Sequence, residues 1–270
     1  MIASENIKNT MTMKSQMKNE SIFQVLEYDK LEGSRDIRTS IKLGLMKNSD
    51  IKLRQVRLIL NDSAVKVESG TLSYMKGNLE IETKTGGIVG LGKKFFQNKV
   101  TGESMFKPVI KGTGEVFLES SFSHFTLIEL EDEEIIVDDG LFYACEEDIE
   151  VGIAMQKNIS SMIFGKEGIY QTRLKGSGIV VLKIPVPEKE IFRCKLFRDE
   201  LKVDGNFAIL RTGNIEFSVE KSGVSLINSS LNGEGLINVY RGTGEVWLVP
   251  TLNIYDELEE DNELDIIDEE

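Results

Sequence analysis

Residues 86–94 read GGIVGLGKK, and this spacing of glycine and lysine resembles that of a phosphate-binding loop. Gly87, Gly92 and Lys93 satisfy most of the pattern G-x-x-x-x-G-K-[ST], in which backbone N–H groups surround a phosphate and the lysine reaches its terminal oxygens. Lys94 stands where the pattern needs a hydroxyl to hold Mg²⁺, and a second cation repels the metal. A strand, not a helix, is expected to follow. We therefore interpret the segment as a glycine-rich β connection and predict no bound nucleotide.

The residue types that build catalytic and metal centres are scarce in this chain. His124 is the only histidine, so a site made of several imidazoles cannot form within one chain. Ser120, Ser121 and Ser123 precede His124, but no third residue is evident to orient the histidine as a general base. We interpret His124 as an exposed connector residue. Cys145 and Cys194 are expected to be small apolar core residues. We predict a protein that is not an enzyme and has no catalytic, metal-binding or cofactor-binding residues.

The charge of the chain is concentrated at its C-terminal end. The 270 residues include 45 acidic and 32 basic ones, giving a net charge of -13. Ten of the acidic residues fall in the segment 255–270, which has no basic residue, and we interpret it as a solvated acidic tail. The remaining chain is nearly neutral and offers no basic face to nucleic acid, so we expect no nucleic-acid partner.

The N-terminal residues and the apolar runs bear on localisation. Residues 1–21 are polar and lack the apolar region of a secretory signal, so we expect a mobile polar arm. No run reaches the roughly 18 apolar residues of a transmembrane helix. We expect a cytoplasmic protein. Phe95 and Phe96, beside the lysines of the segment 86–96, give weak support for peripheral contact with a membrane or a partner.

Three stretches of the chain align with one another. They are VKVESGTLSYMKGNLEIE from Val65, IIVDDGLFYACEEDIEVG from Ile135 and LKVDGNFAILRTGNIEFSV from Leu201. Each is predicted to be one hairpin: a strand reaches a glycine, resumes on an apolar residue two positions later, turns, and returns with alternating residues. The matched glycines are Gly70, Gly140 and Gly205, and the matched apolar residues are Leu72, Phe142 and Phe207.

A second motif follows each stretch and shows that the whole unit is repeated. It reads basic-Gly-[Ser/Thr]-Gly and begins at Lys111, Lys175 and Arg241. Upstream of it lie Glu103, Glu167 and Glu234, which are expected either to accept backbone N–H bonds at their own turns or to converge with the three basic residues.

The alignment also predicts structural roles for the two cysteines and the tryptophan. It matches Cys145 with Met75 and Leu210, and Cys194 with Leu58 and Ile128. It matches Trp247 with Phe117 and Val181, so we expect this tryptophan to pack in a core or between repeats.

Strand signals at short intervals predict an all-β fold. We expect three tandem antiparallel repeats, each a β-sandwich or short barrel, at approximately residues 22–120, 121–186 and 187–254. Packing around a pseudo-threefold axis is the simplest way for three such units to cover one another's apolar faces.

Four segments together resemble the Altered Inheritance of Mitochondria family, which is associated with mitochondrial biogenesis. They are Val67 to Glu82, Gly102 to Phe106, GTGEVFL from Gly112, and the closing NGEGLINVYRGTGEVWLVP. The resemblance covers roughly residues 22–252. It implies a fold similar to the tryptophan RNA-binding attenuator protein, with several β units in one chain, and it implies no activity.

Two functions remain from these observations. The first is a non-catalytic scaffold or assembly protein that acts through protein partners, including further copies of itself. The alternative is a small-ligand-binding protein with a pocket between adjacent repeats.

Overall fold

The computed structural model describes residues 4–16, 21–82, 107–156, 169–221 and 236–260. Within them the chain consists mainly of antiparallel strands, which confirms the all-β prediction. The strands are β1 (Ile7–Lys14), β2 (Ile22–Tyr28), β3 (Arg54–Val67), β4 (Leu72–Glu82), β5 (Val109–Leu118), β6 (His124–Asp138), β7 (Phe142–Glu146), β8 (Glu150–Gln156), β9 (Ile169–Ile184), β10 (Phe192–Val203), β11 (Ala208–Thr212), β12 (Ile215–Lys221) and β13 (Leu236–Leu248). The helices of the described residues are α1 (Ile37–Asn48), the short η1 (Glu188–Glu190) and α3 (Leu252–Glu260).

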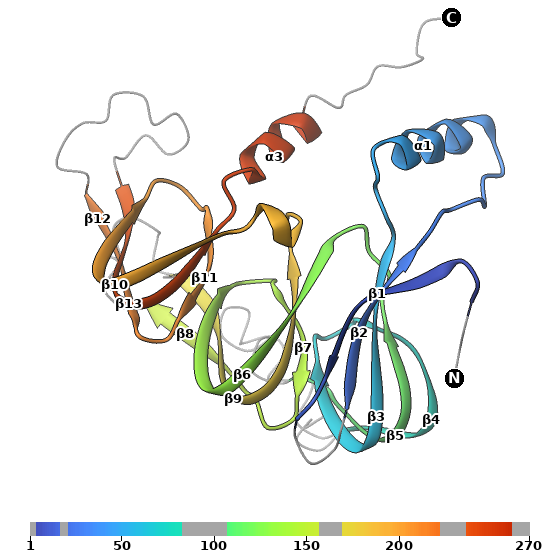
Figure 1. Cartoon of the computed structure of the whole chain (residues 1–270), viewed down its shortest axis with the longest axis horizontal. Helices are drawn as coiled ribbons and strands as arrows, with labels where there is room; N and C mark the ends of the chain where they lie inside the picture. The colour runs from blue at the N-terminus through green and yellow to red at the C-terminus, as the bar shows by residue number, and fades with distance from the viewer. Residues whose placement is uncertain (1–3, 17–20, 83–106, 157–168, 222–235, 261–270) are drawn as a thin grey trace, which may run out of the picture.

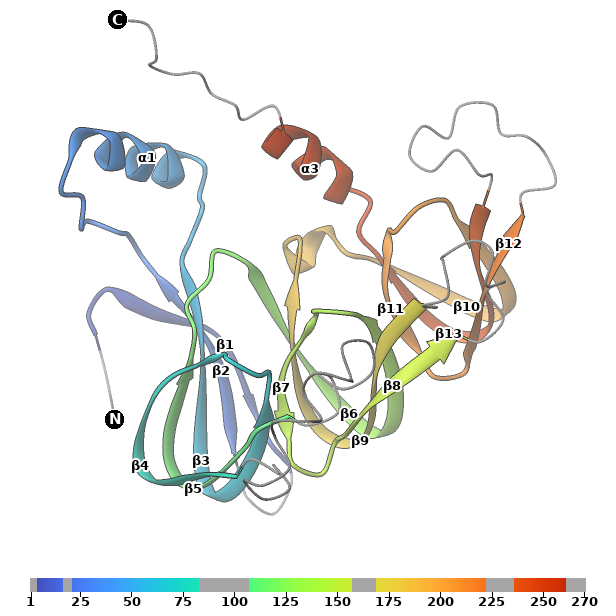
Figure 2. The same ribbon diagram turned by 180° about the vertical axis from the view of Figure 1, so that it is seen from behind.

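The strands form three β units that lie side by side in a row (Figures 1 and 2). Unit 1 comprises β1 to β5, unit 2 comprises β6 to β9, and unit 3 comprises β10 to β13. Hydrogen-bonded strands run through all three in the order β1-β2-β3-β7-β9-β6-β11-β13-β10. The sheet therefore passes continuously from unit 1 through unit 2 to unit 3.

The repeated strands do not form the hairpins that the sequence pattern predicted. In unit 2, β7 and β8 follow one another along the same partner, β9, and the chain does not turn back between them. Strand β6 lies on the other edge of β9. The alternation of apolar residues correctly predicted strands. A strand that turns back and a strand that continues after a short break have the same alternation, so the pattern could not distinguish them.

The basic-Gly-[Ser/Thr]-Gly motif lies where the last strand of each unit bends across its neighbours. Its hydroxyl oxygen accepts a hydrogen bond from the backbone N–H of a residue with positive φ in β3, β6 or β10. The pairs are Thr113 with Asp62 at 2.9 Å, Ser177 with Asp132 at 2.8 Å, and Thr243 with Arg198 at 3.0 Å. The glycines permit close crossing. A Cβ on Gly112 would meet the carbonyl oxygen of Asn78 at 2.1 Å. The motif is therefore a structural corner that recurs in each unit.

The apolar cores extend across the boundaries between units. The core of unit 1 includes Tyr143 and Ala144 from the first short strand of unit 2, and the core of unit 2 includes Leu210 and Trp247 from unit 3. The third core is built from unit 3 alone. Each of the first two units is thus covered in part by its successor, since burying apolar surface against a neighbour stabilises both.

Several segments differ from the expected domain plan. Ile7–Lys14 were placed in a mobile polar arm, yet they form β1, whose alternate residues pack Met11 and Met13 against the first core. Helix α3 begins before the expected acidic tail and includes its first residues; residues 261–270 lie outside the described part of the chain. The pseudo-threefold packing is not seen, because the described strand pairs join units 1 and 2 and units 2 and 3 but not units 3 and 1. Among the described residues, no helix has the length and apolarity needed to span a membrane.

Candidate assembly edges and the junctions between units

The first junction, between units 1 and 2, is a short antiparallel ladder between β3 and β7. Its residue pairs are Val65 with Glu146, Lys66 with Cys145, and Val67 with Ala144. Two backbone hydrogen bonds flank the ladder, from the Glu147 N–H to the Ala64 carbonyl at 3.2 Å and from the Glu68 N–H to the Tyr143 carbonyl at 2.9 Å. A strand edge of one unit is therefore paired directly with a strand edge of the next.

Lys66 strengthens this junction from the side. Its Nζ donates to the carbonyl oxygens of Glu147 and Ile149, at 2.6 and 2.7 Å. Both carbonyls belong to unit 2, just after β7. A lysine on a strand edge often discourages pairing, but here its charge is used to hold two backbone acceptors of the adjacent unit.

The second junction repeats the first between β6 and β11. Its residue pairs are Ile135 with Thr212, Ile136 with Arg211, and Val137 with Leu210. The Gly213 N–H donates to the Glu134 carbonyl at 2.7 Å, in the place of the bond from Glu147 to Ala64. Two junctions of the same register thus occur in one chain.

The register corrects the alignment of the third repeat by one residue. In the structure, Leu72 and Phe142 correspond to Ala208 and not to Phe207. The three residues pair with the last leucines of β5, β9 and β13, which are Leu118, Leu182 and Leu248. Cys145 likewise corresponds to Met75 and Arg211, not to Leu210. The loop before β11 has one more residue after Gly205 than the loop before β7 has after Gly140. An alignment that matches these glycines is therefore shifted by one residue, whereas an alignment that matches Val67, Val137 and Val203 is correct.

Because of this one-residue shift, the sequence alignment did not show that Arg211 occupies a core position of the repeat. It is 2% exposed, at a position where units 1 and 2 have Met75 and Cys145. Its Nη1 donates to Gln171 Oε1 at 2.5 Å, and Gln171 in turn donates to Asp138 Oδ1 at 2.8 Å. The guanidinium lies over the Phe217 ring, 5.3 Å from its centroid. A buried cation is thus held between units 2 and 3 by a polar chain and an aromatic ring.

Burial raises the pKa of Asp138, and this gives a pH-dependent prediction. The folded protein binds a proton at this carboxyl more readily than the unfolded chain, so stability falls as the pH rises from the ordinary value of 3.8 through the raised pKa. Asp138→Asn keeps an oxygen for Gln171 and removes the charge. We expect it to raise the free energy of unfolding at pH 7, because the folded protein then no longer buries a charged carboxylate at this position.

The measurement is urea unfolding of both proteins from pH 7 down to pH 4. The advantage of the Asn variant should shrink as the pH falls, because wild-type Asp138 becomes neutral as well. An advantage that is constant with pH, or a loss of stability at pH 7, would contradict a carboxylate destabilised by burial.

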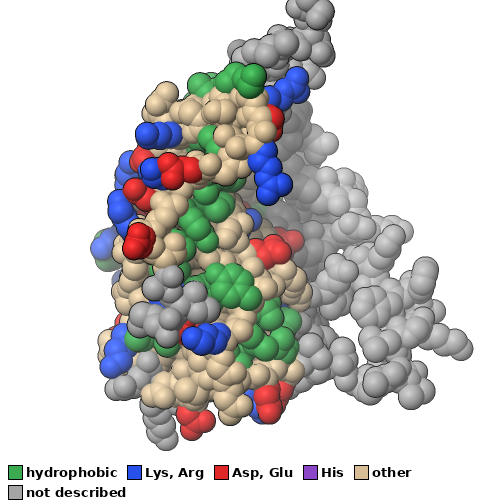
Figure 3. Space-filling model, turned by 90° about the vertical axis from the view of Figure 1, so that its right-hand side faces the viewer, with side chains coloured by type: hydrophobic (Ala, Val, Ile, Leu, Met, Phe, Trp, Pro, Cys, Tyr) green, Lys and Arg blue, Asp and Glu red, His purple; other side chains and the backbone are tan. Residues whose placement is uncertain are grey.

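The counterparts of these junction strands at the two ends of the row are exposed. Tyr74 and Met75 in β4 are 43% and 38% exposed, whereas the corresponding Ala144 and Cys145 are both 0% exposed. In the described residues β4 pairs only with β5. We call residues 73–77 the β4 edge. Figure 3 views this end of the molecule and shows hydrophobic side chains gathered among charged ones on its surface.

The opposite end of the row presents the complementary strand. Leu201, Lys202 and Val203 close β10 as Val65, Lys66 and Val67 close β3, and in the described residues β10 pairs only with β13. Lys202 is exposed where Lys66 is half-buried. We call residues 200–204 the β10 edge. The two ends of the row therefore present the two halves of a junction that the chain forms twice internally.

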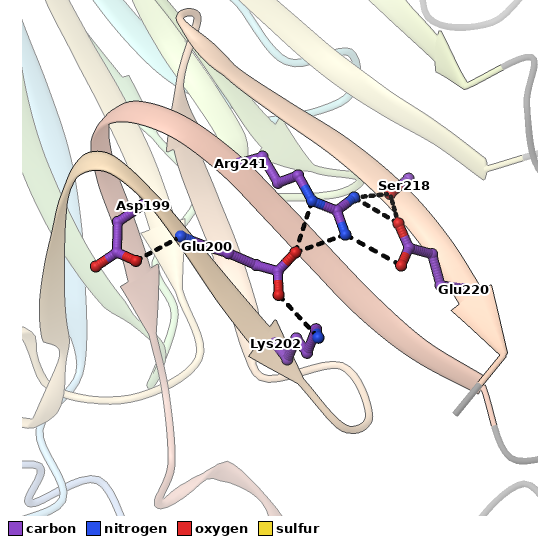
Figure 4. A network of polar contacts seen from close by, with 6 residues as sticks. All are labelled: Asp199, Glu200, Lys202, Ser218, Glu220 and Arg241. Atoms are coloured by element: carbon purple, nitrogen blue, oxygen red, sulfur yellow. Dashed lines mark hydrogen bonds and ion pairs between the residues drawn. The ribbon is translucent and has the colours of Figure 1, made fainter. Parts of the chain in front are cut away.

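An ion-pair network holds the β10 edge in place (Figure 4). Arg241 contacts Glu200 on one side at 2.5 Å and Glu220 on the other at 2.5 Å, and Lys202 contacts Glu200 at 2.8 Å. The network lowers the pKa of Glu220 to about 2, chiefly through its hydrogen bond from Arg241. The Glu200 N–H donates to the side chain of Asp199, at 2.8 Å.

A small polar cavity of about 290 Å³ lies beside the first junction. Unit 1 lines it with Asp62, Asn78, Glu80 and Lys111, and Glu147 of unit 2 closes one side. Lys111 is ion-paired with Glu82. Charged side chains of both signs suit a small polar molecule better than an apolar one.

The basic residues of the repeated motif lie beside glutamates of the neighbouring strands. Lys111 and Arg241 pair with glutamates on flanking strands, and Lys175 lies in register between Glu134 and Glu150. Glu103, Glu167 and Glu234 lie outside the described residues, as does the segment 86–96 with its phosphate-loop resemblance and its phenylalanines.

The other residues singled out from the sequence have structural surroundings. Cys145 is fully buried, which raises its pKa to about 12, and Cys194 is half-buried opposite Val246. Trp247 packs in the second core with Arg193 over its ring at 4.3 Å. His124 is not an exposed connector residue: it is half-buried, opens β6 opposite Ile184, and has a pKa lowered mainly by burial.

Helices α1 and α3 lie on the same long side of the row (Figures 1 and 2), and both have exposed apolar side chains. In α1 these are Ile37, Ile41 and Leu45, spaced along one face. In α3 they include Ile254 and Leu258. Exposed apolar faces of this kind are typical of surfaces that bind other proteins.

Comparisons with known proteins find a family and similar proteins for this chain. A model of the family described as Mitochondrial biogenesis AIM24 matches residues 46–251. An uncharacterised protein of Streptococcus pyogenes serotype M6 is 25% identical over 199 residues, which cover 71% of this chain and 78% of that protein. A crystal structure of a Streptococcus pyogenes protein is similar with a TM-score of 0.56 and 20% identity, covering 78% of this chain and 94% of that one, and this likeness concerns the fold alone.

Proposed function

This chain belongs to the Mitochondrial biogenesis AIM24 family, and from its exposed strand edges we propose that it is a non-catalytic scaffold that acts through protein–protein contacts. The observation that carries the proposal is the pair of edges at the ends of the row. Positions that are fully buried at the first junction are 43% and 38% exposed in β4. Exposed strand edges bind other strands through backbone hydrogen bonds, so they favour a role in assembly.

Two further features support a scaffold. The exposed apolar faces of α1 and α3 offer additional contact surfaces on one side of the row. The two helices also carry opposite charges. Helix α1 has Arg38, Lys42 and Lys47 and no acidic residue, whereas α3 has Asp256 and Glu257. A protein with surfaces of different character can hold several partners at once.

The remaining expectations stay as proposals. Pseudo-threefold packing would require β10 to pair with β4 of the same chain. The likeness to the attenuator protein, the cytoplasmic location and a recruiting role for the acidic tail also remain predictions. The cavity beside the first junction keeps the ligand-binding alternative open for a small polar molecule.

The scaffold and ligand-binding functions are separated by comparing an edge variant with a cavity variant. We expect native-gel sizing of gently lysed cells to find the wild-type chain in complexes larger than a monomer. Met75→Pro, on the β4 edge, should reduce these complexes, whereas the matched control Glu80→Ala, on the same strand but in the cavity lining, should leave them unchanged. A chain that migrates as a monomer in every case would contradict the scaffold proposal. Loss of the complexes only in Glu80→Ala would favour the ligand-binding alternative.

A further inference from the structure

We propose that the β10 edge of one copy pairs with the β4 edge of a second copy, in the register of the internal junctions. This inference rests on the proposed scaffold function and names the partner. Transferring the register to the β10 edge and the β4 edge sets Val203 opposite Tyr74, Lys202 opposite Met75, and Leu201 opposite Lys76. The new contact is a third instance of a junction that the chain already forms twice.

The backbone groups needed for this ladder point outward. In the first junction the Glu147 N–H donates to the Ala64 carbonyl, and the Tyr143 carbonyl accepts from the Glu68 N–H. Because backbone groups alternate in direction along a strand, the N–H and carbonyl of Cys145 also point toward β3. The corresponding residues of the β4 edge are Ser73, Met75 and Gly77. On the other side Ala64 and Glu68 bond to unit 2, and their counterparts on the β10 edge are Glu200 and Asp204. Gly77 N–H then donates to the Glu200 carbonyl, and Asp204 N–H donates to the Ser73 carbonyl.

Lys202 fits this contact because Lys66 already performs the same role. Lys66 bonds to the carbonyls of Glu147 and Ile149, whose counterparts in unit 1 are Gly77 and Leu79. Lys202 replaces its exposed ion pair with Glu200 by bonds to these two carbonyls of the second copy. The stretch Leu201-Lys202-Val203 repeats Val65-Lys66-Val67 with one conservative change.

The two edges differ, so the contact is head-to-tail. Each copy that binds through its β10 edge still presents its β4 edge, and such contacts produce rings or open chains of copies. The internal junctions form between covalently joined units at high effective concentration, whereas this one forms between separate chains. Association is therefore concentration-dependent.

The test uses one proline in each edge. Met75→Pro and Lys202→Pro each remove an outward N–H, the position at which proline is tolerated in an edge strand. In sedimentation velocity the wild type is expected to associate with rising concentration, and each variant alone to remain a monomer. An equal mixture of the two variants should form a dimer and nothing larger, because one supplies an intact β10 edge and the other an intact β4 edge.

Further variants keep the test decisive if a proline disturbs folding. Met75→Arg sets like charges opposite each other at Lys202 and should also abolish association, whereas Ile81→Arg, an exposed residue of β4 beyond the edge, should not. A mixture of the proline variants, both folded by circular dichroism, that stays monomeric while the wild type associates would overturn head-to-tail pairing. A wild type that is monomeric at all concentrations would overturn self-association. If complexes in cells contain no second, differently tagged copy, this inference fails while the scaffold function stands.

Discussion

Replacing Gly112 by alanine is expected to lower the free energy of unfolding by about 4 kcal/mol, the range of the most damaging single substitutions. Gly112 has a φ of 125°, which L-residues rarely adopt, and a Cβ would meet the Asn78 carbonyl oxygen at 2.1 Å. That oxygen belongs to the backbone of β4, so it cannot move without displacing the strand. The substitution therefore forces β4 and β5 apart at the corner where unit 1 closes.

Gly44→Ala is the matched control for this prediction. Gly44 lies in α1 with nothing within 4 Å of a Cβ, and alanine there is expected to stabilise the helix by up to about 1 kcal/mol. Urea unfolding followed by circular dichroism measures both effects. Equal and small changes in the two variants would show that the Gly-x-Gly corner does not depend on its missing side chain.

Arg211→Ala is expected to cost about 3 kcal/mol of unfolding free energy, the usual consequence of removing one member of a buried charged network. The substitution leaves Gln171 without its donor and opens a cavity between units 2 and 3. Asp138 loses a nearby positive charge that lowers its pKa, so its carboxylate becomes still less favourable. Both effects act at the second junction.

Met75→Ala tests whether the loss of stability expected for Arg211→Ala comes from burial at the junction or from this position in the repeat. Met75 occupies the same register position in unit 1, but it is 38% exposed. At low protein concentration its truncation should cost under about 1 kcal/mol, as at other exposed sites. Arg211→Met, which fills the space with an apolar side chain, should recover part of the stability lost in Arg211→Ala. A loss in Met75→Ala as large as that in Arg211→Ala would contradict this account.

The repeated strands and their class were predictable from the sequence, because alternating apolar residues and the repeated Gly-[Ser/Thr]-Gly segment mark them directly. The family resemblance, too, is confirmed by the match over residues 46–251. The predicted equivalence of Cys194 with Leu58 and Ile128 agrees with the strand register. The three residues lie opposite the equivalent valines of β13, β5 and β9, which are Val246, Val116 and Val180.

What the sequence did not reveal depends on pairing between distant strands. A strand that continues along its partner and one that turns back have the same alternation, so the hairpin prediction was wrong for β7 and β8. Strand β1 was missed because only alternate residues of a polar segment pack against the core. Arg211 was missed because one extra loop residue shifted the alignment. Its charge in a stretch of buried apolar residues was the available signal.

Amide hydrogen exchange tests most directly whether the two ends of the row are unpaired halves of one junction. At low and high protein concentration, the amides of Cys145 and Arg211 should be protected alike, because the internal junctions are always formed. The amides of Met75 and Lys202 should exchange rapidly at low concentration and become protected together at high concentration. Protection of both edges at every concentration would indicate closure within one chain, and rapid exchange of both in an associated sample would show that copies meet elsewhere; either result contradicts the account.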